Sequence, residues 1–205
     1  MKTCAVIVAH PDDETLWAGG TILSNPEWNW FVISLCRKSD KNREPRFNQA
    51  MLKLNAQGVM GDLDDGPDQK PINIQEVEQA ILDLLPIPFY DLIITHSPQG
   101  EYTRHLRHEE TSIAVVNLLE SGKIITNDLW IFAYDDHKKT HFPMPIVEAP
   151  IFHKLSHKIW LEKYKIITDT YGFDTHSWEA QTTPKTEAFW QFKNSLEAKK
   201  RLIKK

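Results

Sequence analysis

The sequence predicts an α/β fold in which a mostly parallel sheet is covered by helices on both faces. Short, continuously apolar runs rich in β-formers alternate with longer segments whose apolar residues recur at helical spacing. Strands that are apolar at every position are typical of parallel sheets, because both faces of such a sheet are buried. The 205 residues, 41% of them hydrophobic, are also enough to bury a substantial core.

The expected strands and helices follow one another in regular order along the first two thirds of the chain. Four strands are expected at CAVIVA (4–9), WFVISLC (30–36), DLIITH (91–96) and LWIFAY (129–134), and the stretch 58–66 could hold a further short one. Helices are expected around 14–24, 46–57, 73–85 and 108–120. This alternation predicts βαβ units over a core of about residues 2–135.

The regular alternation fades after about residue 137. Three prolines (143, 145 and 150) mark a loop-rich region, and a helix is expected over 154–167. The segment 182–205 starts with residues typical of a helix start and ends as a basic amphipathic tail. We therefore expect one domain over 1–205, with a loop-rich and helical C-terminal extension of about 136–205.

Composition excludes several classes of protein. The net charge of −4 gives no basic footprint for nucleic acid, and no apolar run approaches the roughly 20 residues of a membrane span. The two cysteines lie inside expected strands and form neither a disulfide framework nor a CxxC site. The apolar stretch before His10 is shorter than the apolar region of a signal peptide, so none is expected there. A cytoplasmic protein with a small-molecule substrate is expected, and a homo-oligomer remains possible.

Two polar clusters follow expected strands at their carboxyl ends. AHPDDE (9–14) follows the first strand, and THSPQGEYTRHLRHEE (95–110) begins at the end of the strand over 91–96. In open α/β sheets ligands bind outside the carboxyl ends of the strands. His105 and His108 stand three apart where a helix begins, so both imidazoles can point at one spot. If the two strands are neighbours, that spot lies above AHPDDE.

The residue types in these clusters fit a catalytic zinc site. Such a site needs about three protein ligands and an open position for water, and His10, Asp13 and His108 would supply them. Asp12 then remains free beside the metal and can deprotonate the bound water, while His105 can donate to a developing oxyanion. Together these groups would hydrolyse an amide or an ester.

Other interpretations of the same residues remain open. Carboxylates at 12, 13 and 14 also favour a helix N-terminus through its dipole, and His105 and His108 could be ordinary surface histidines. His96 would hydrogen-bond locally or support a ligand. The other histidines are expected to be structural: His137, His141, His153, His157 and His176. The basic residues after the second strand are expected to form a solvated face, from which one of them could reach substrate: Arg37, Lys38, Arg43 and Arg46.

Two other functions compete with metal-assisted hydrolysis. Receiver-like and phosphatase-like folds also place paired aspartates after a first strand, where they hold magnesium for phosphoryl transfer. Magnesium prefers oxygen ligands, and the histidines therefore favour zinc. A nucleotide-binding module is a third possibility, but no GxGxxG follows the first strand, and Gly19 and Gly20 better explain close helix packing.

AHPDDE followed by TLWAGG, with a later GEY and an HxxH pair, resembles the LmbE-like, or PIG-L, family of zinc-dependent de-N-acetylases. The resemblance spans about residues 2–135. It implies a Rossmann-like sheet, zinc on His10, Asp13 and His108, Asp12 as general base and His105 as an electrostatic or acid partner. It also implies an N-acetylated amino-sugar conjugate as substrate, with release of acetate.

The chain departs from the typical family pattern near the second histidine pair. Typical members have YGHPDH, whereas here Thr103 and Arg104 separate Tyr102 from the histidines, and HLRH replaces HPDH. Tyr102 is therefore given no catalytic role on the strength of the sequence.

Overall fold

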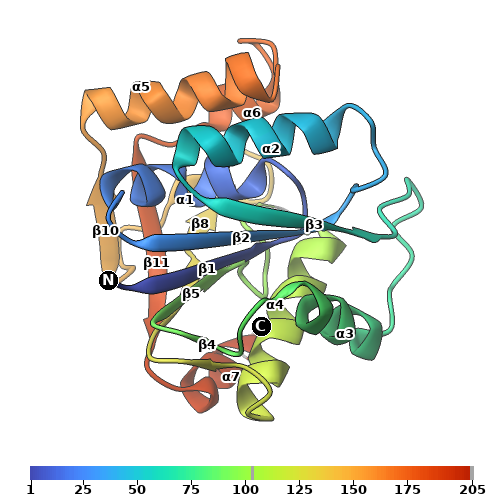
Figure 1. Cartoon of the computed structure of the whole chain (residues 1–205). Helices are drawn as coiled ribbons and strands as arrows, with labels where there is room; N and C mark the ends of the chain where they lie inside the picture. The colour runs from blue at the N-terminus through green and yellow to red at the C-terminus, as the bar shows by residue number, and fades with distance from the viewer. Residues whose placement is uncertain (103, 204–205) are drawn as a thin grey trace.

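The computed structural model of the chain, which describes residues 1–102 and 104–203, is built around a seven-stranded sheet (Figure 1). The strand order is β10-β11-β7-β5-β1-β2-β3. The five strands from β7 to β3 in this order are mutually parallel, and β11 runs antiparallel to both of its neighbours. The bounds are β1 Thr3–Val8, β2 Asn29–Cys36, β3 Gln57–Leu63, β5 Leu92–Thr95, β7 Leu129–Phe132, β10 Ile151–Lys154 and β11 Thr186–Phe192.

Helices cover both faces of this sheet, as the sequence predicts (Figure 1). One face carries α1 (Asp13–Ser24) and α2 (Arg43–Leu54), and α5 (His157–Lys165) packs on α1. The other face carries α3 (Ile74–Leu84), α4 (Leu106–Glu120) and α7 (Ser195–Ile203). The remaining elements are η1 (Ile166–Thr170), α6 (Trp178–Thr182) and the paired short strands β4 (Phe89–Tyr90) with β6 (Ile125–Thr126) and β8 (Tyr134–Asp135) with β9 (Met144–Pro145).

The central strand β1 shows why its sequence forms a buried strand. Cys4, Val6 and Val8 pack in the core under α1 and α2, whereas Ala5 and Ile7 pack in the core under α3 and α4. Side chains of a strand alternate between its two faces, so a strand between two helical layers must be apolar throughout. The expected strands of the first two thirds of the chain, and the four helices between them, are confirmed within a few residues.

The C-terminal extension differs from the expectation. The helix-like start expected from residue 182 is wrong, because Thr186–Phe192 forms strand β11, which pairs with β7 through Phe189 and Phe132. The extension is therefore more than loops and helices: β10 and β11 add two strands to the main sheet. Only α7 forms a helix in the expected tail, whose last two residues, 204 and 205, lie outside the described residues.

The winding of the sheet defines where a ligand would bind. From β1 the chain proceeds to β2 and β3 on one side, and then to β5 and β7 on the other. The carboxyl ends of β1 and β5 therefore flank the point at which the strand order reverses, the usual ligand position in such sheets. No helix within residues 1–102 and 104–203 is long and apolar enough to span a membrane.

Candidate metal centre

Three side chains meet at the carboxyl ends of β1 and β5. His10 Nδ1 lies 3.1 Å from Asp13 Oδ2 and 3.2 Å from His108 Nε2, and the last two atoms are 3.3 Å apart. Asp13 and His108 are buried, and the His10 side chain is 14% exposed. The structure thus brings together the three ligands expected from the sequence, in a nearly equilateral triangle of donor atoms.

The size of this triangle fits tetrahedral zinc. Zinc binds imidazole nitrogen and carboxylate oxygen at about 2.0–2.2 Å, so ligand atoms around a tetrahedral ion are about 3.3–3.5 Å apart. The observed separations of 3.1–3.3 Å are close to that spacing. His10 and Asp13 also line the inner cavity described below, so an ion held by these residues would be reached from that cavity.

The hydrogen bonds around the two imidazoles direct their ring protons away from the triangle. His10 Nε2 lies 3.1 Å from Asp65 Oδ1, and His108 Nδ1 lies 2.6 Å from Glu101 Oε2. Each carboxylate accepts the ring proton, which leaves His10 Nδ1 and His108 Nε2 as lone-pair donors that face each other and Asp13. Against the effect of burial, the carboxylates raise the pKa of both imidazoles, so this environment favours positive charge. The donor set therefore fits a cation.

Glu101 connects the metal-facing residues to the core and was not singled out from the sequence. Its Oε2 contacts both His108 and His96 Nδ1, and its Oε1 accepts the Ser97 backbone N–H. Although burial opposes ionisation, the two imidazoles lower the pKa of Glu101 to about 2. His96 Nε2 accepts the Ala9 N–H at 3.0 Å and lies 3.5 Å from Asp13 Oδ2. His96 therefore supports the site, and with Asp13 and His108 it also forms a second group of side chains close enough to hold a metal ion. The only available signal was the position of Glu101 in GEY.

Asp65 is the second site residue that the sequence did not single out. Its loop is held by two side chains of α4, Arg107 and Glu110, which we call the clamp. Arg107 is 2% exposed and donates to the backbone oxygens of Asp64 and Lys70 at 2.5 and 2.7 Å. Glu110 accepts the Ile72 N–H at 2.8 Å. The loop after β3 is thereby fastened at both ends, with Asp65 aimed at His10. Arg107 is one of the two residues, with Leu106, at which HLRH differs from HPDH.

Asp12 stands beside the triangle with an unusual backbone. Its φ of 137° is rare for a residue with a side chain and costs free energy, which is typical of functional sites. Arg43 Nη1 donates to Asp12 Oδ2 at 3.0 Å. Burial and the charge of Asp13 raise the pKa of Asp12 well above its usual value, although Arg43 opposes this shift. A carboxylate of raised basicity beside a metal centre is suited to accept a proton.

His105 caps the space above the triangle. Its ring packs at 4.4 Å from that of His108 and at 4.6 Å from that of His10. Burial and the neighbouring imidazoles lower the pKa of His105 to about 3, so it is neutral at pH 7. Its Nδ1 has no hydrogen-bond partner among the described residues. A neutral imidazole can donate an N–H to an oxyanion, but it carries no extra proton to give away.

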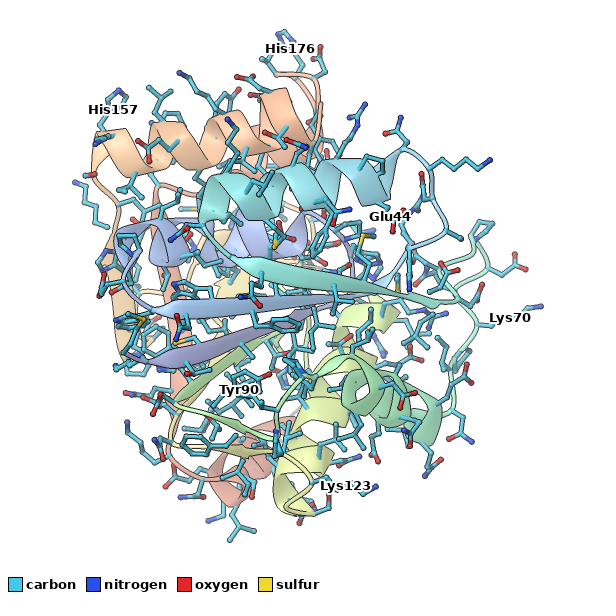
Figure 2. The ribbon with its side chains drawn as sticks, in the orientation of Figure 1. Glu44, Lys70, Tyr90, Lys123, His157 and His176 are labelled. Atoms are coloured by element: carbon cyan, nitrogen blue, oxygen red, sulfur yellow. The ribbon has the colours of Figure 1, made fainter. Side chains whose placement is uncertain are left out.

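The basic residues after β2 do more than form a solvated face. Arg43 contacts Asp12, and Arg37 contacts Asp65 at 3.3 Å, so both line the site. Arg46 instead donates to the Tyr171 carbonyl, and Lys38 is exposed. Of the histidines expected to be structural, His141 lines the outer cavity described below, whereas His157 and His176 project outward at the surface (Figure 2).

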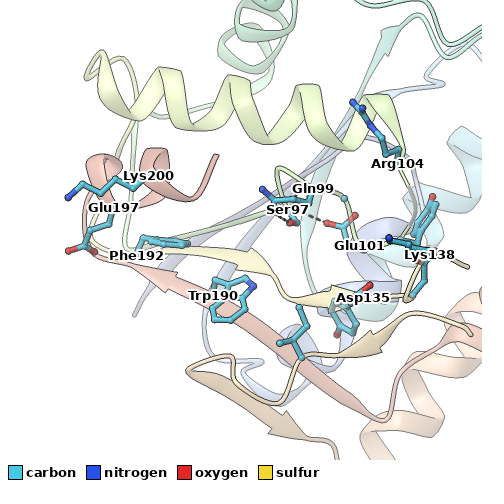
Figure 3. A pocket seen from close by; sticks show the side chains of 15 residues that line it. Ser97, Gln99, Glu101, Arg104, Asp135, Lys138, Trp190, Phe192, Glu197 and Lys200 are labelled. Atoms are coloured by element: carbon cyan, nitrogen blue, oxygen red, sulfur yellow. Dashed lines mark hydrogen bonds between the residues drawn. The ribbon is translucent and has the colours of Figure 1, made fainter. Parts of the chain in front are cut away.

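A cavity of about 180 Å³, which we call the inner cavity, is lined by His10, Asp12, Asp13 and His105 among others. It adjoins a wider outer cavity of about 750 Å³, whose walls include Phe142, Pro143 and Lys139. A third cavity of about 630 Å³ lies between the loop after β5 and strand β11, with Gln99, Lys138 and Trp190 in its wall (Figure 3). Tyr102 lines all three, and burial raises the pKa of its hydroxyl, which therefore stays protonated.

A known family matches the part of the chain that carries this site. The profile described as "PIG-L: GlcNAc-PI de-N-acetylase" matches residues 5–119, more than half of the chain. This span includes the two polar clusters at 9–14 and 95–110, and also Asp65 and Glu101, which the sequence did not single out. An uncharacterized protein of Acanthamoeba polyphaga mimivirus is 25% identical over 185 residues, which cover 83% of this chain and 76% of that protein.

Solved structures share the fold at low sequence identity. The N,N'-diacetylchitobiose deacetylase of Pyrococcus horikoshii has a TM-score of 0.71 and 13% identity, over 95% of this chain and 85% of that one. The 4-carboxy-2-hydroxymuconate hydratase of Pseudomonas putida has a TM-score of 0.63 and 16% identity, over 93% of this chain and 96% of that one. The same fold thus serves both a deacetylase and a hydratase, so the reaction must be argued from the site.

Proposed function

The chain belongs to the PIG-L family of de-N-acetylases, and from this premise we propose that it hydrolyses the N-acetyl group of an N-acetylated amino-sugar conjugate and releases acetate. We propose further that a divalent metal, with zinc as the working candidate, is held by His10, Asp13 and His108. The expectation of a cytoplasmic protein is kept as part of the same proposal.

The observation that carries the proposal is the convergence of three lone-pair donors. His10 Nδ1, Asp13 Oδ2 and His108 Nε2 lie within 3.3 Å of one another, and the ring protons are directed away, toward Asp65 and Glu101. A cation at this point would interact favourably with all three atoms. A metal bound there would polarise a carbonyl group and lower the pKa of a water molecule.

The remaining residues have roles that follow from their positions. Asp12, oriented by Arg43, accepts the proton of the attacking water and can return it to the departing amine. His105, neutral at pH 7, donates an N–H to the oxygen that becomes negative as water adds to the acetyl carbon. These assignments support amide hydrolysis, with cleavage of the C–N bond into acetate and a free amine.

Magnesium-dependent phosphoryl transfer is the alternative that the sequence left open. Two of the three converging donor atoms are imidazole nitrogens, which magnesium avoids in favour of oxygen. The third ligand atom is a carboxylate oxygen, and such a mixed set is typical of zinc and related metals. The donor chemistry therefore favours hydrolysis of the acetyl amide.

The test offers the metal-loaded protein N-acetylglucosaminides, 4-nitrophenyl phosphate and a hydratable 2-hydroxymuconate in parallel. Acetate and free amine are expected in equal amounts from the first substrate only. His108→Ala should lose both the metal and the activity, because two donors cannot hold the ion tightly. Exposed His157→Ala, far from the site, is the matched control (Figure 2).

Two results would overturn the proposal. Magnesium-dependent phosphate release that survives His108→Ala would show that the histidines do not serve the chemistry. Hydration of the muconate without acetate release would place the chain with the hydratase instead of the deacetylases of the same fold.

A further inference from the structure

The residues that separate the inner from the outer cavity come partly from the C-terminal extension, and they have the chemistry of a sugar-binding wall. We infer that Trp178 and Glu179 bind the amino-sugar ring of the substrate. The indole packs against the C–H face of the ring, and the carboxylate accepts hydrogen bonds from its hydroxyl groups. This inference rests on the proposed function and extends it to residues outside the matched span of the family.

Position is the first argument. Among the described residues, Tyr102, Trp178 and Glu179 are the ones that line both the inner cavity of about 180 Å³ and the outer cavity of about 750 Å³. The inner cavity can hold an acetamide but is smaller than the roughly 300–1,000 Å³ typical of pockets for whole ligands. When the acetyl group reaches the metal centre, the ring that carries it must therefore lie at the junction, against these three residues.

Trp178 is exposed and yet held in one orientation. It is 36% exposed, its ring meets that of Tyr102 edge-on at 4.8 Å, and Trp17 supports it at 6.4 Å. The turn before it is fixed by Ser177, whose Oγ accepts the Ala180 N–H at 3.2 Å. A large aromatic surface that needs no reordering is well suited to stack on the apolar face of a sugar.

Glu179 offers a carboxylate that the protein itself does not use. In the part of the chain that the structure describes, no donor or cation pairs with its side chain, although it lies in the cavity wall. The two arginines of the same cavity are already engaged, Arg37 with Asp40 and Asp65 and Arg43 with Asp12. A carboxylate only accepts hydrogen bonds, and sugar hydroxyls donate them, so the two are complementary.

Together these features predict that residues of the C-terminal extension bind the sugar, whereas residues of the core carry out the reaction. Among the described residues, neither Trp178 nor Glu179 is a hydrogen-bond partner of His10, Asp13 or His108. Loss of Trp178 or Glu179 should therefore weaken substrate binding without changing the affinity for metal. A residue that only stabilised the fold would change unfolding and metal affinity together.

The experiment compares Trp178→Ala and Glu179→Gln with the native chain, all metal-loaded. It measures kcat and KM for acetate release from methyl N-acetylglucosaminide, and the Kd of the deacetylated methyl glucosaminide by titration calorimetry. KM and Kd should each rise about tenfold or more, as expected for the loss of a charge-assisted hydrogen bond or an aromatic contact, with kcat and zinc affinity unchanged. Trp28→Ala, at the amino end of the sheet, and exposed Glu148→Gln are matched controls that should change nothing.

The outcomes separate this inference from the proposed function. If the native chain releases acetate and both variants keep its KM and Kd, the inference is wrong and the function stands. If the native chain binds methyl glucosaminide, the variants lose that binding, and no acetate is released, the sugar site stands and the reaction is wrong. A parallel loss of zinc affinity in both variants would assign the residues to the metal centre and overturn the inference.

Discussion

Two clusters of buried charge lie at opposite ends of helix α1, and they differ in whether their polar atoms are satisfied. Near the C-terminal end, Lys163 and Glu187 form an ion pair at 2.7 Å, both fully buried. Glu187 also accepts the N–H groups of Gly20 and Thr21 and the Thr21 hydroxyl, at 2.6–2.7 Å. Four donors meet the two oxygens of one carboxylate, and the charges cancel. We call this the closed pair.

The metal-facing cluster at the N-terminal end of α1 shows the opposite balance. His10, Asp13 and His108 turn three lone pairs toward one point, while the ring protons of the two histidines are directed to Asp65 and Glu101 outside it. Both clusters are largely buried, although the His10 side chain is 14% exposed, so burial is not the main difference between them. The balance of charge and lone pairs is the main difference: the closed pair cancels its own charge, whereas the metal-facing cluster directs two imidazole nitrogens and a carboxylate oxygen to one point, a set suited to a cation.

The largest expected effect separates catalysis from metal binding inside the metal-facing cluster. Asp12→Asn should lower kcat by about 10² to 10⁴, the usual contribution of a general base, because the amide cannot accept the proton of water. Zinc content and the denaturation midpoint should stay unchanged, since Asp12 is not among the three converging donors. Zinc loss as severe as that of Asp13→Ala would mean that the roles of the two aspartates are reversed.

The second prediction breaks the closed pair. Lys163→Met should lower the free energy of unfolding by about 3–5 kcal/mol, because Glu187 keeps a buried charge without its counter-ion. Urea unfolding measures the loss, and chelator competition on the folded protein should find unchanged zinc affinity. The double variant with Glu187→Gln should recover part of the stability. If it were no better than Lys163→Met, the charge balance would not be the cause.

The comparison also explains how far the sequence could predict this molecule. The strands of the core were predictable because a strand between two helical layers is apolar at every position, as in Val6 and Ile7. Strand β11 was not, because Glu187 at its second position resembles the acidic residue of a helix start. In the fold this glutamate is buried against Lys163, a partner 24 residues away that no local pattern reveals.

The three proposed ligands could be selected from their motifs, whereas the residues that orient them could not. His10, Asp13 and His108 follow strand ends in recognisable patterns, and the structure brings them together. Asp65 and Glu101 reach the same place through loops, and loop geometry depends on contacts distant in the sequence, such as the hydrogen bonds from Arg107 to the loop of Asp65. Sequence periodicity carries no information about such contacts.

The third prediction tests that supporting layer. Asp65→Asn should weaken zinc binding about 10- to 100-fold, the usual effect of removing a carboxylate that orients a ligating histidine. Arg107→Met should weaken it in the same direction, because the loop of Asp65 loses its anchor on α4. Arg104→Met, at a surface arginine that pairs with Glu109, is the control. Chelator competition measures all three, and equal affinity for Arg107→Met and Arg104→Met would show that the clamp does not act on His10.

The smallest effect is expected where α1 meets the closed pair. Two adjacent glycines there, Gly19 and Gly20, should respond differently to substitution by alanine. A Cβ on Gly20 would lie 2.4 Å from a methyl of buried Leu155 and 2.9 Å from Glu187 Oε1, whereas a Cβ on Gly19 meets nothing closer than 3.4 Å. Gly20→Ala should therefore cost about 1–3 kcal/mol of stability through overpacking. Gly19→Ala should be neutral or gain up to about 1 kcal/mol, because alanine favours a helix interior. Thermal unfolding of the two variants measures the difference. If Gly20→Ala were as stable as Gly19→Ala, α1 would not be packed tightly against Leu155 and Glu187 of the C-terminal extension, and the overpacking argument would be wrong.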